Sequence, residues 1–254
     1  MRCLKVAAIG FLITVCLAMP SSSLGGKRTR KVVEGWLQTM KETEASLEAG
    51  NWEKAKRDIE EVIEDMSGRI KTGDSEAKLL GTATLLRSLS QAGLGNEDAA
   101  HWDYDVAEAL MPELSKVDLD RFGTAGQQLE TWRAAKEDKF KDSLKMTGGP
   151  SVGGSPPQDI TPPKKLRADA PQFPFGKRAG CIDGVVVVQG VVEERGLVTQ
   201  PRLMTDQDPL LSYAALEAVR NWRFEPARIE GKPVPVFYHL TINFKLPSCS
   251  PSRG

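Results

Sequence analysis

The sequence has little of what catalysis, metal binding or nucleic-acid binding requires. Its 254 residues include two histidines, His101 and His239, and neither stands in a pattern with a serine or a carboxylate that would indicate a general base. Basic and acidic residues balance at 34 each, whereas a nucleic-acid-binding protein normally has a clear basic excess or a basic stripe. We therefore expect no catalytic residue, no cofactor and no nucleic-acid partner.

The sequence also lacks an apolar run of the roughly 20 residues that a membrane-spanning helix needs. The run Val6–Met19 has 14 residues, follows Arg2 and Lys5, and is succeeded by small and turn-forming residues. This layout is typical of a secretory signal peptide, so residues 1–25 are expected to be cleaved and the mature chain to be exported. An uncleaved membrane anchor is the alternative, and only then is contact with a membrane expected.

Cysteine is scarce in the part of the chain that remains after export. Cys3 and Cys16 leave with the signal peptide, and the bulky Val15 disfavours acylation of Cys16, so Cys181 and Cys249 remain. In an oxidising compartment these two are consistent with a disulfide, which would contribute about 4 kcal/mol in the chain-entropy model. Two unpaired thiols are the alternative. Their spacing, with so few histidines, does not fit a structural zinc site, so no metal is expected.

Residues 29–146 have the apolar periodicity of helices. Five helices are expected, the fifth beginning near Asp118, and the first four are separated by glycine-containing turns such as Gly50-Asn51 and Gly95-Asn96. Pro112 ends the fourth helix. This half of the chain is therefore predicted to be an all-α domain.

The small residues of this half recur at similar offsets. Those that follow Gly50 and Gly95 resemble a tetratricopeptide unit, in which paired helices approach closely around a turn. Thr84, Arg87 and Ser88, however, occupy positions where that repeat has aromatic and Leu-Gly residues. A plain helical bundle is the alternative, and both readings predict a domain that binds other proteins.

Residues 147–165 differ sharply in composition. Glycine and proline cluster at Gly148–Pro150 and Gly153–Pro157, so neither helix nor sheet is expected before Pro163. No Gly-Lys-Ser/Thr follows, which excludes a phosphate-binding loop. The segment is interpreted as a linker between two domains.

Residues 166–247 have the period-two pattern of strands around one helix. Gly184–Val192 and Leu197–Met204 are expected to form a β-hairpin with Gly196 in its turn. Asp208 and the following proline are expected to start a helix. Six residues should form the buried stripe of that helix: Leu211, Ala214, Ala215, Ala218, Val219 and Trp222.

A long last strand is expected after Gly231, with apolar residues at alternate positions. Val234, Val236, Tyr238, Leu240, Ile242, Phe244 and Leu246 share one face, and Pro235, Phe237, His239, Thr241, Asn243 and Lys245 share the other. The predicted order is β-β-α-β, with the helix covering one face of a three-stranded antiparallel sheet. Together with the helical half, this makes the fold class α+β.

Several ordered motifs give this half a family resemblance. Phe173-Pro174, Ile182–Val187, Trp222–Ala227, Gly231–Val234 and Ile242–Phe244 resemble the TonB C-terminal domain over about residues 171–246. The motif positions that we interpret as structural are Pro174, Gly184, Gly196, Trp222, Phe224, Pro226 and Gly231. The sequence departs from the family at Phe173, where a tyrosine is usual, and at Cys181, where a glycine is usual.

The resemblance implies that the sheet binds an extended peptide by adding it as a strand, and that the peptide is a segment of an outer-membrane receptor or another periplasmic protein. The last strand is the expected edge, and Pro233 and Pro235 before it are alternatively read as protection of that edge. The residues assigned to peptide binding are Val236, Phe237, Tyr238, His239, Leu240, Thr241, Ile242, Asn243 and Phe244.

Three functions are compatible with the sequence. The first is a periplasmic protein-binding adaptor, not an enzyme, associated with TonB-dependent transport. The second is an energy transducer anchored in the inner membrane, although Val6–Met19 offers almost no polar residue for coupling to a motor. The third is a structural or assembly protein whose sheet forms a homodimer.

Overall fold

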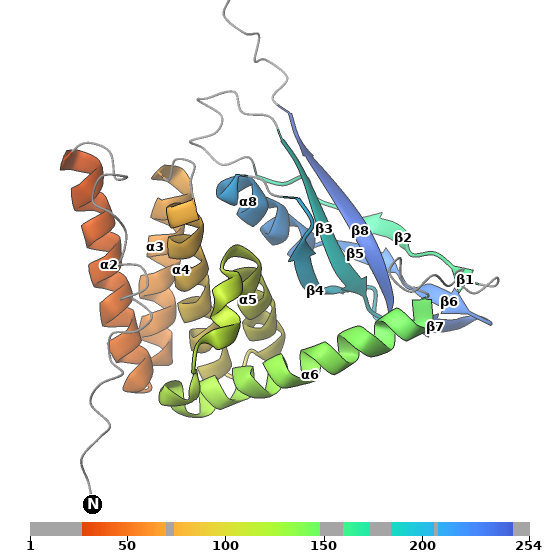
Figure 1. Ribbon diagram of the computed structural model, residues 1–254, viewed down its shortest axis with the longest axis horizontal. Coiled ribbons are helices and arrows are strands. Elements are labelled where there is room, and N and C mark those ends of the chain that lie inside the picture. The colour runs from red at the N-terminus through yellow and green to blue at the C-terminus, as the bar shows by residue number, and fades with distance from the viewer. Residues whose placement is uncertain (1–26, 70–73, 148–159, 173–183, 206–207, 246–254) are drawn as a thin grey trace, which may run out of the picture.

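The computed structural model describes residues 27–69, 74–147, 160–172, 184–205 and 208–245 (Figure 1). The N-terminal half of this part is helical, and the C-terminal half consists of antiparallel sheets with one helix. The predicted α+β class is confirmed. The signal peptide and most of the predicted linker lie outside the described residues.

The helical half is a stack of antiparallel helices followed by one long helix (Figure 1). The long helix runs from the stack toward the sheets. The elements are α2 (Lys27–Glu48), α3 (Trp52–Arg69), α4 (Asp74–Gly93), α5 (Glu97–Leu110), the 3-10 turns η1 (Pro112–Lys116) and η2 (Asp120–Phe122), and α6 (Gly123–Thr147).

The two glycine-asparagine turns have the same geometry. Gly50 and Gly95 have φ values of 74° and 77°, which glycine adopts without a steric cost. Asn51 N donates to Ser46 O, and Asn96 N donates in the same way five residues back, as at a helix C-cap of the Schellman type. The predicted breaks between helices are therefore confirmed at these turns. The tetratricopeptide assignment stays a prediction.

The start of the fifth helix differs from the prediction. It begins at Gly123 and not near Asp118, because the Asp118 carboxylate accepts a hydrogen bond from Asp120 N and folds the chain into a turn. Gly126 then packs so closely that a Cβ there would lie 1.8 Å from Leu119 O. The sequence pattern indicated a helix but not this close approach.

Helix α4 is the centre of the helical half and is buried on nearly all sides. Its polar residues are satisfied locally: Thr82, Thr84 and Ser90 each donate to the carbonyl four residues earlier. Ser88 donates to Ala100 O on α5 at 2.7 Å. These hydrogen bonds explain how a helix with several hydroxyl side chains packs in a core.

The main sheet has the predicted β-β-α-β arrangement. Strands β3 (Gly184–Val192), β4 (Val198–Leu203) and β8 (Val236–Phe244) lie in the order β4-β3-β8, and all pairs are antiparallel. Helix α8 (Pro209–Arg220) starts as predicted, with the Asp208 carboxylate accepting from Leu210 N and Leu211 N. It lies between the sheet and the helical half (Figure 1).

Five short strands extend the C-terminal half beyond the prediction. The strands are β1 (Ile160–Thr161), β2 (Lys164–Arg167), β5 (Arg223–Glu225), β6 (Ala227–Ile229) and β7 (Lys232–Val234), in the sheets β1-β6-β7 and β2-β5.

Two expectations are corrected by these strands. The absence of sheet before Pro163 is wrong at Ile160–Thr161, because β6 supplies an antiparallel partner for these residues. The single long last strand is wrong at Pro235, where the chain breaks between β7 and β8. Glu230 and Gly231, with φ values of 51° and 78°, instead make a tight hairpin between β6 and β7.

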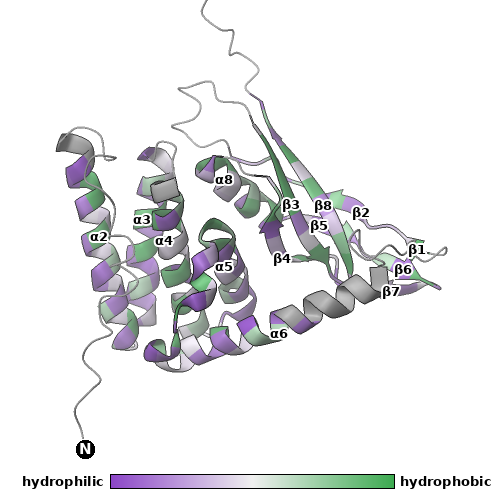
Figure 2. Ribbon diagram, viewed as in Figure 1, coloured by the Kyte–Doolittle hydropathy of each residue, from purple (hydrophilic) through white to green (hydrophobic). Residues whose placement is uncertain are grey.

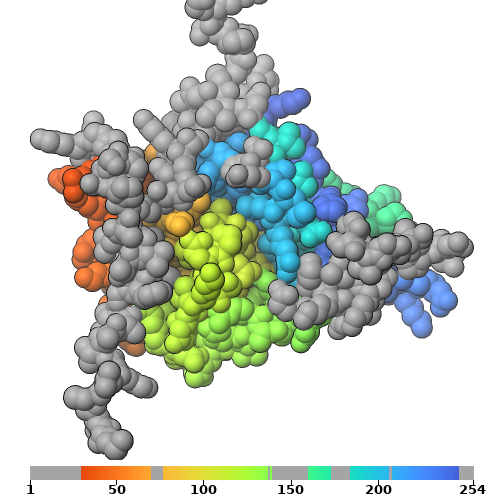
Figure 3. Space-filling view, viewed as in Figure 1, coloured from red at the N-terminus to blue at the C-terminus, as the bar shows by residue number. Residues whose placement is uncertain are grey.

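One hydrophobic core runs through both halves of the molecule. Figure 2 shows hydrophobic segments along β3, β8 and α8, and Figure 3 shows α5 in direct contact with α8 and β4. The predicted stripe of α8 is too narrow: Tyr213 and Leu216 are also buried, whereas Ala214 and Ala218 are half-buried. The reason is that the sheet covers one face of α8 and the helical half covers another. None of the described helices has the length and apolar composition to cross a membrane.

Candidate peptide-binding edge

Strand β8 forms one edge of the main sheet. It pairs with β3 in an unbroken register from Gly184↔Phe244 to Val192↔Val236. Among the residues that the structure describes, no strand pairs with its other side. The sheet therefore has the geometry that strand addition requires, an antiparallel edge with a continuous register behind it.

The hydrogen bonds of Val187 identify which backbone groups face outward. Val187 N donates to Thr205 Oγ1 and Val187 O accepts from Met204 N, so both groups point away from β8. Bonded and non-bonded pairs alternate along an antiparallel ladder. Thr241, the partner of Val187, therefore directs its N–H and C=O to the outer edge, and so do His239 and Asn243.

The side chains of these three residues are exposed, whereas Leu240 and Ile242 between them are buried. This alternation confirms the predicted faces of the strand. The predicted set Val236–Phe244 thus divides into residues that hold the strand in the core and residues whose backbone is directed outward. Its use in peptide binding stays a prediction.

The motif residues hold the sheet together. Gly196 has a φ of 75°, its carbonyl accepts from Phe224 N at 2.9 Å, and a Cβ there would lie 1.8 Å from Phe224 O. Phe224 packs edge-on against Tyr238 of β8, with ring centroids 5.8 Å apart. Trp222 Nε1 donates to Asp169 O at 2.9 Å. Together these contacts connect the hairpin turn, β5, β8 and the segment after β2.

The remaining motif positions lie at turns and strand ends. Gly184 begins β3, Pro226 separates β5 from β6, and Gly231 lies in the β6–β7 turn with positive φ. Pro174, Cys181 and Cys249 lie outside the described residues.

Comparison with known proteins agrees with this geometry. A family model for the C-terminal region of the Gram-negative bacterial TonB protein matches residues 169–246. Protein TonB of Vibrio cholerae serotype O1 is 32% identical over 77 residues, which are 30% of this chain and 32% of that protein.

Residues 169–246 form a TonB C-terminal domain. The chain spans about a third of the length of this curated relative, and its helical half lies outside the matched segment.

A buried ionic cluster joins the TonB domain to the helical half. Arg87 on α4 donates to both oxygens of Asp103 on α5, at 2.8 and 2.7 Å, and also to Tyr213 Oη at 3.3 Å and Glu217 Oε1 at 3.0 Å on α8. Arg220 at the end of α8 donates to Asp103 at 3.2 Å. We call Arg87, Asp103, Tyr213, Glu217 and Arg220 the seam cluster. Arg87 of the helical half bonds Glu217 of the TonB domain, and Arg220 of the TonB domain bonds Asp103 of the helical half.

Burial sets the electrostatics of the seam cluster. Asp103 is fully buried, and desolvation raises its pKa above the ordinary value although Arg87 and Arg220 lower it. Desolvation opposes the charged form of Arg87, but Asp103, Tyr213 and Glu217 raise its pKa well above the ordinary value. The pKa of Tyr213 is also raised, mainly by burial. Arg87 therefore stays charged and needs its partners.

Arg87 is the residue of the seam cluster that the sequence marks as unusual. Arg87 occupies the leucine of the Leu-Gly positions of the tetratricopeptide pattern, and in the structure its guanidinium donates to both carboxylate oxygens of Asp103. A charged residue in an otherwise apolar helix often indicates a buried partner. Which partner it has depends on tertiary contacts that the sequence does not display.

The two histidines are half-buried or exposed. His101 stacks on Trp132, with ring centroids 4.1 Å apart, and His239 is exposed beside Gln189. Within the described ranges, no group of three metal-ligating side chains occurs.

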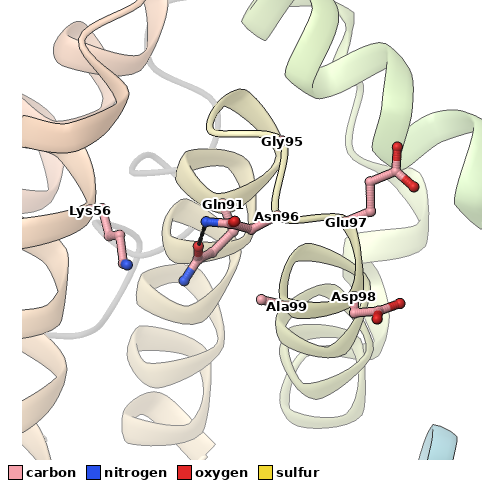
Figure 4. A pocket seen from close by; sticks show the side chains of 7 residues that line it. All are labelled: Lys56, Gln91, Gly95, Asn96, Glu97, Asp98 and Ala99. Carbon is pink, nitrogen blue, oxygen red and sulfur yellow. Dashed lines mark hydrogen bonds between the residues drawn. The ribbon is translucent and has the colours of Figure 1, made fainter.

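A shallow hollow of about 640 Å³ lies between α3 and the α4–α5 turn. Figure 4 shows the side chains that line it. Lys56 reaches toward this hollow from α3, and Asn96 Nδ2 donates to Gln91 Oε1 at 2.9 Å on the opposite side. Because these side chains are exposed or bonded to one another, nothing here resembles a prepared ligand site.

Proposed function

We propose that the TonB domain captures an extended peptide segment of an envelope protein by adding it as a strand to the outer edge of β8. The chain would act as a periplasmic protein-binding adaptor in TonB-dependent transport, with the helical half holding a second protein. The proposal rests on the resemblance of residues 169–246, about a third of this chain, to TonB.

One observation carries the proposal: the N–H and C=O groups of His239, Thr241 and Asn243 are directed outward from a sheet edge that no described strand covers. A guest strand would form up to six hydrogen bonds with these residues, three to their N–H groups and three to their C=O groups, each contributing about 0.5–1.5 kcal/mol net. The exposed side chains of the same residues leave room for the guest. Pro233 and Pro235 precede β8 and remove no donor from it.

The experiment uses the full chain, exported from a Gram-negative host, as bait for a phage library of random ten-residue peptides. Binding of the enriched peptides is measured by fluorescence anisotropy on the wild type, on Thr241→Pro and on the control Thr241→Val. Proline at 241 removes an outward N–H while leaving the hydrogen bonds between β8 and β3 intact. Valine keeps the N–H and a side chain of similar shape.

Peptides selected on the wild type should bind Thr241→Val with unchanged affinity and Thr241→Pro at least about tenfold more weakly. Equal binding to the two variants, or no enriched peptide at all, would overturn the proposal. Sedimentation of the same samples tests the homodimer reading: a wild-type dimer that Thr241→Pro dissociates would place a second copy of the chain, not a guest peptide, on β8.

The fate of the N-terminal segment separates an adaptor from an energy transducer. We expect the mass and N-terminal sequence of the exported protein to correspond to cleavage near residue 25, because the apolar run is too short for a typical spanning helix. A chain that still begins at Met1 and remains in the inner membrane would favour the transducer. A gain of two hydrogens on reduction would indicate a Cys181–Cys249 disulfide.

A further inference from the structure

A groove runs between the helical half and the TonB domain. It has a volume of about 1320 Å³, and its walls are one face of α3 and one face of α8. Residues 169–172 and the end of β8 from Asn243 to Lys245 close its sides. Because α3 belongs to the helical half, the groove exists only while the two halves are docked.

The groove walls combine apolar surface with negative charge. Ile63 and Leu210 contribute apolar surface from opposite walls, whereas Glu60 and Glu64 are exposed one turn apart on α3. Lys56 approaches Glu60 only at 4.0 Å, the limit of an ion pair.

The positive charges in the groove do not balance the negative ones. Its lining includes the carboxylates of Glu60, Glu64, Asp169 and Glu217 and two cations. Asp169 is bonded to Arg167 and Glu217 to Arg87, so Glu60 and Glu64 are the acidic groups available to a ligand. One cation is Arg87, which is already bonded to Asp103 and Glu217. The other is Lys245, which is exposed. A basic segment is therefore the complementary occupant.

The groove continues the proposed peptide-binding edge. Asn243 belongs to both, since its backbone is directed outward from β8 and the residue lines the groove. On α3 the lining extends from Glu60 to Gly68, about 12 Å at 1.5 Å per residue. An extended peptide covers that distance in about four residues.

We propose that the groove binds the basic N-terminal part of the peptide whose following residues add to β8. The inference rests on the proposed function and specifies the ligand class: a segment with one or two Lys or Arg residues preceding a strand-forming stretch. An antiparallel guest places its N-terminal residues beside the C-terminal end of β8, where the groove begins. Every strand pair that the structure describes is antiparallel.

The test selects peptides from the same random library with three baits, and compares the positions at which charged residues are enriched. The baits are the wild type, the double variant Glu60→Gln/Glu64→Gln, and the charge reversal Glu60→Lys/Glu64→Lys. Glu53→Gln/Glu61→Gln is the matched control, because both of these residues are exposed on α3 and neither lines the groove.

On the wild type and on the control, Lys and Arg should be enriched in the first four positions of the selected peptides. That enrichment should disappear on the glutamine variant and change to Asp and Glu on the lysine variant. A selected peptide should bind the glutamine variant about two- to tenfold more weakly than the control, and the difference should shrink at high salt.

Failure of the inference is distinguishable from failure of the proposed function. Peptides that depend on Thr241 but show no N-terminal basic preference would overturn the groove proposal and leave strand addition standing. A basic preference at the C-terminal positions, or one that survives the glutamine variant, would also overturn it. Peptides that depend on Glu60 and Glu64 but not on Thr241 would overturn both the continuity with β8 and the proposed function.

Discussion

Helix α8 and strand β8 of the TonB domain differ in how their polar groups are used. On α8, the buried Tyr213 and the half-buried Glu217 are hydrogen-bonded to Arg87 of the helical half. On β8, backbone groups are directed outward, and the side chains beside them are exposed.

The difference shows which contacts are already used within the chain. A buried charge network is favourable only when every partner is in place, so the seam cluster holds the helical half in one position on α8. A strand edge tolerates the absence of a partner, because water can bond to its N–H and C=O groups. The fixed seam keeps α3 beside the end of β8, and thereby shapes the groove.

The largest expected effect is at the seam. Asp103→Ala leaves the Arg87 guanidinium buried without its bidentate partner, and should lower the free energy of unfolding by about 3–5 kcal/mol. Urea unfolding of the full chain measures this. The double variant Arg87→Met/Asp103→Leu should recover most of the loss, because it removes both charges together. A cost below about 1 kcal/mol for the single variant would show that the seam does not depend on this pair.

A smaller effect is expected at Tyr213, whose hydroxyl oxygen accepts a hydrogen bond from Arg87. Tyr213→Phe should lower the free energy of unfolding by about 1 kcal/mol at neutral pH.

The same variant should change the alkaline limb of the stability curve. Burial raises the pKa of Tyr213 in the folded state, so the hydroxyl ionises more readily in the unfolded chain. Stability is fully present below about pH 10 and falls above it by about 1.4 kcal/mol per pH unit for each such tyrosine. Tyr213→Phe should therefore make the free energy of unfolding fall less steeply above pH 10. Part of the fall should remain, because the pKa of Tyr104 is also raised by burial. An unchanged slope between pH 10 and 11.5 would contradict the burial of this hydroxyl.

The smallest effect on stability is expected at the edge. Thr241→Val should change the free energy of unfolding by less than about 0.5 kcal/mol, because the side chain is exposed and the strand keeps its pairing with β3. A loss comparable to that at the seam would mean that Thr241 is already committed to a partner within the chain. Urea unfolding followed by circular dichroism is sufficient to distinguish the small expected loss of stability from one comparable to that at the seam.

The sequence was sufficient for elements whose cause is local. The β3–β4 hairpin follows from period-two patterning and Gly196, and the start of α8 follows from the cap at Asp208. The exposed side chains of His239, Thr241 and Asn243 agree with the alternation predicted for the last strand.

Features that arise from distant contacts were not predictable in this way. Strand β1 forms because β6 provides a partner, and no local pattern at Ile160 indicates it. The second buried face of α8 and the seam cluster exist because the helical half docks there, which periodicity within one helix cannot reveal. The groove is a product of the same docking.

Amide hydrogen exchange of the full chain, with and without a selected peptide, tests the central claim most directly. In the free protein the N–H groups of Leu240 and Ile242 should be protected by β3, whereas those of His239, Thr241 and Asn243 should exchange rapidly. Peptide binding should protect these three selectively. Outward amides that are already protected in the free monomer, or that stay unprotected in the complex, would contradict strand addition at β8.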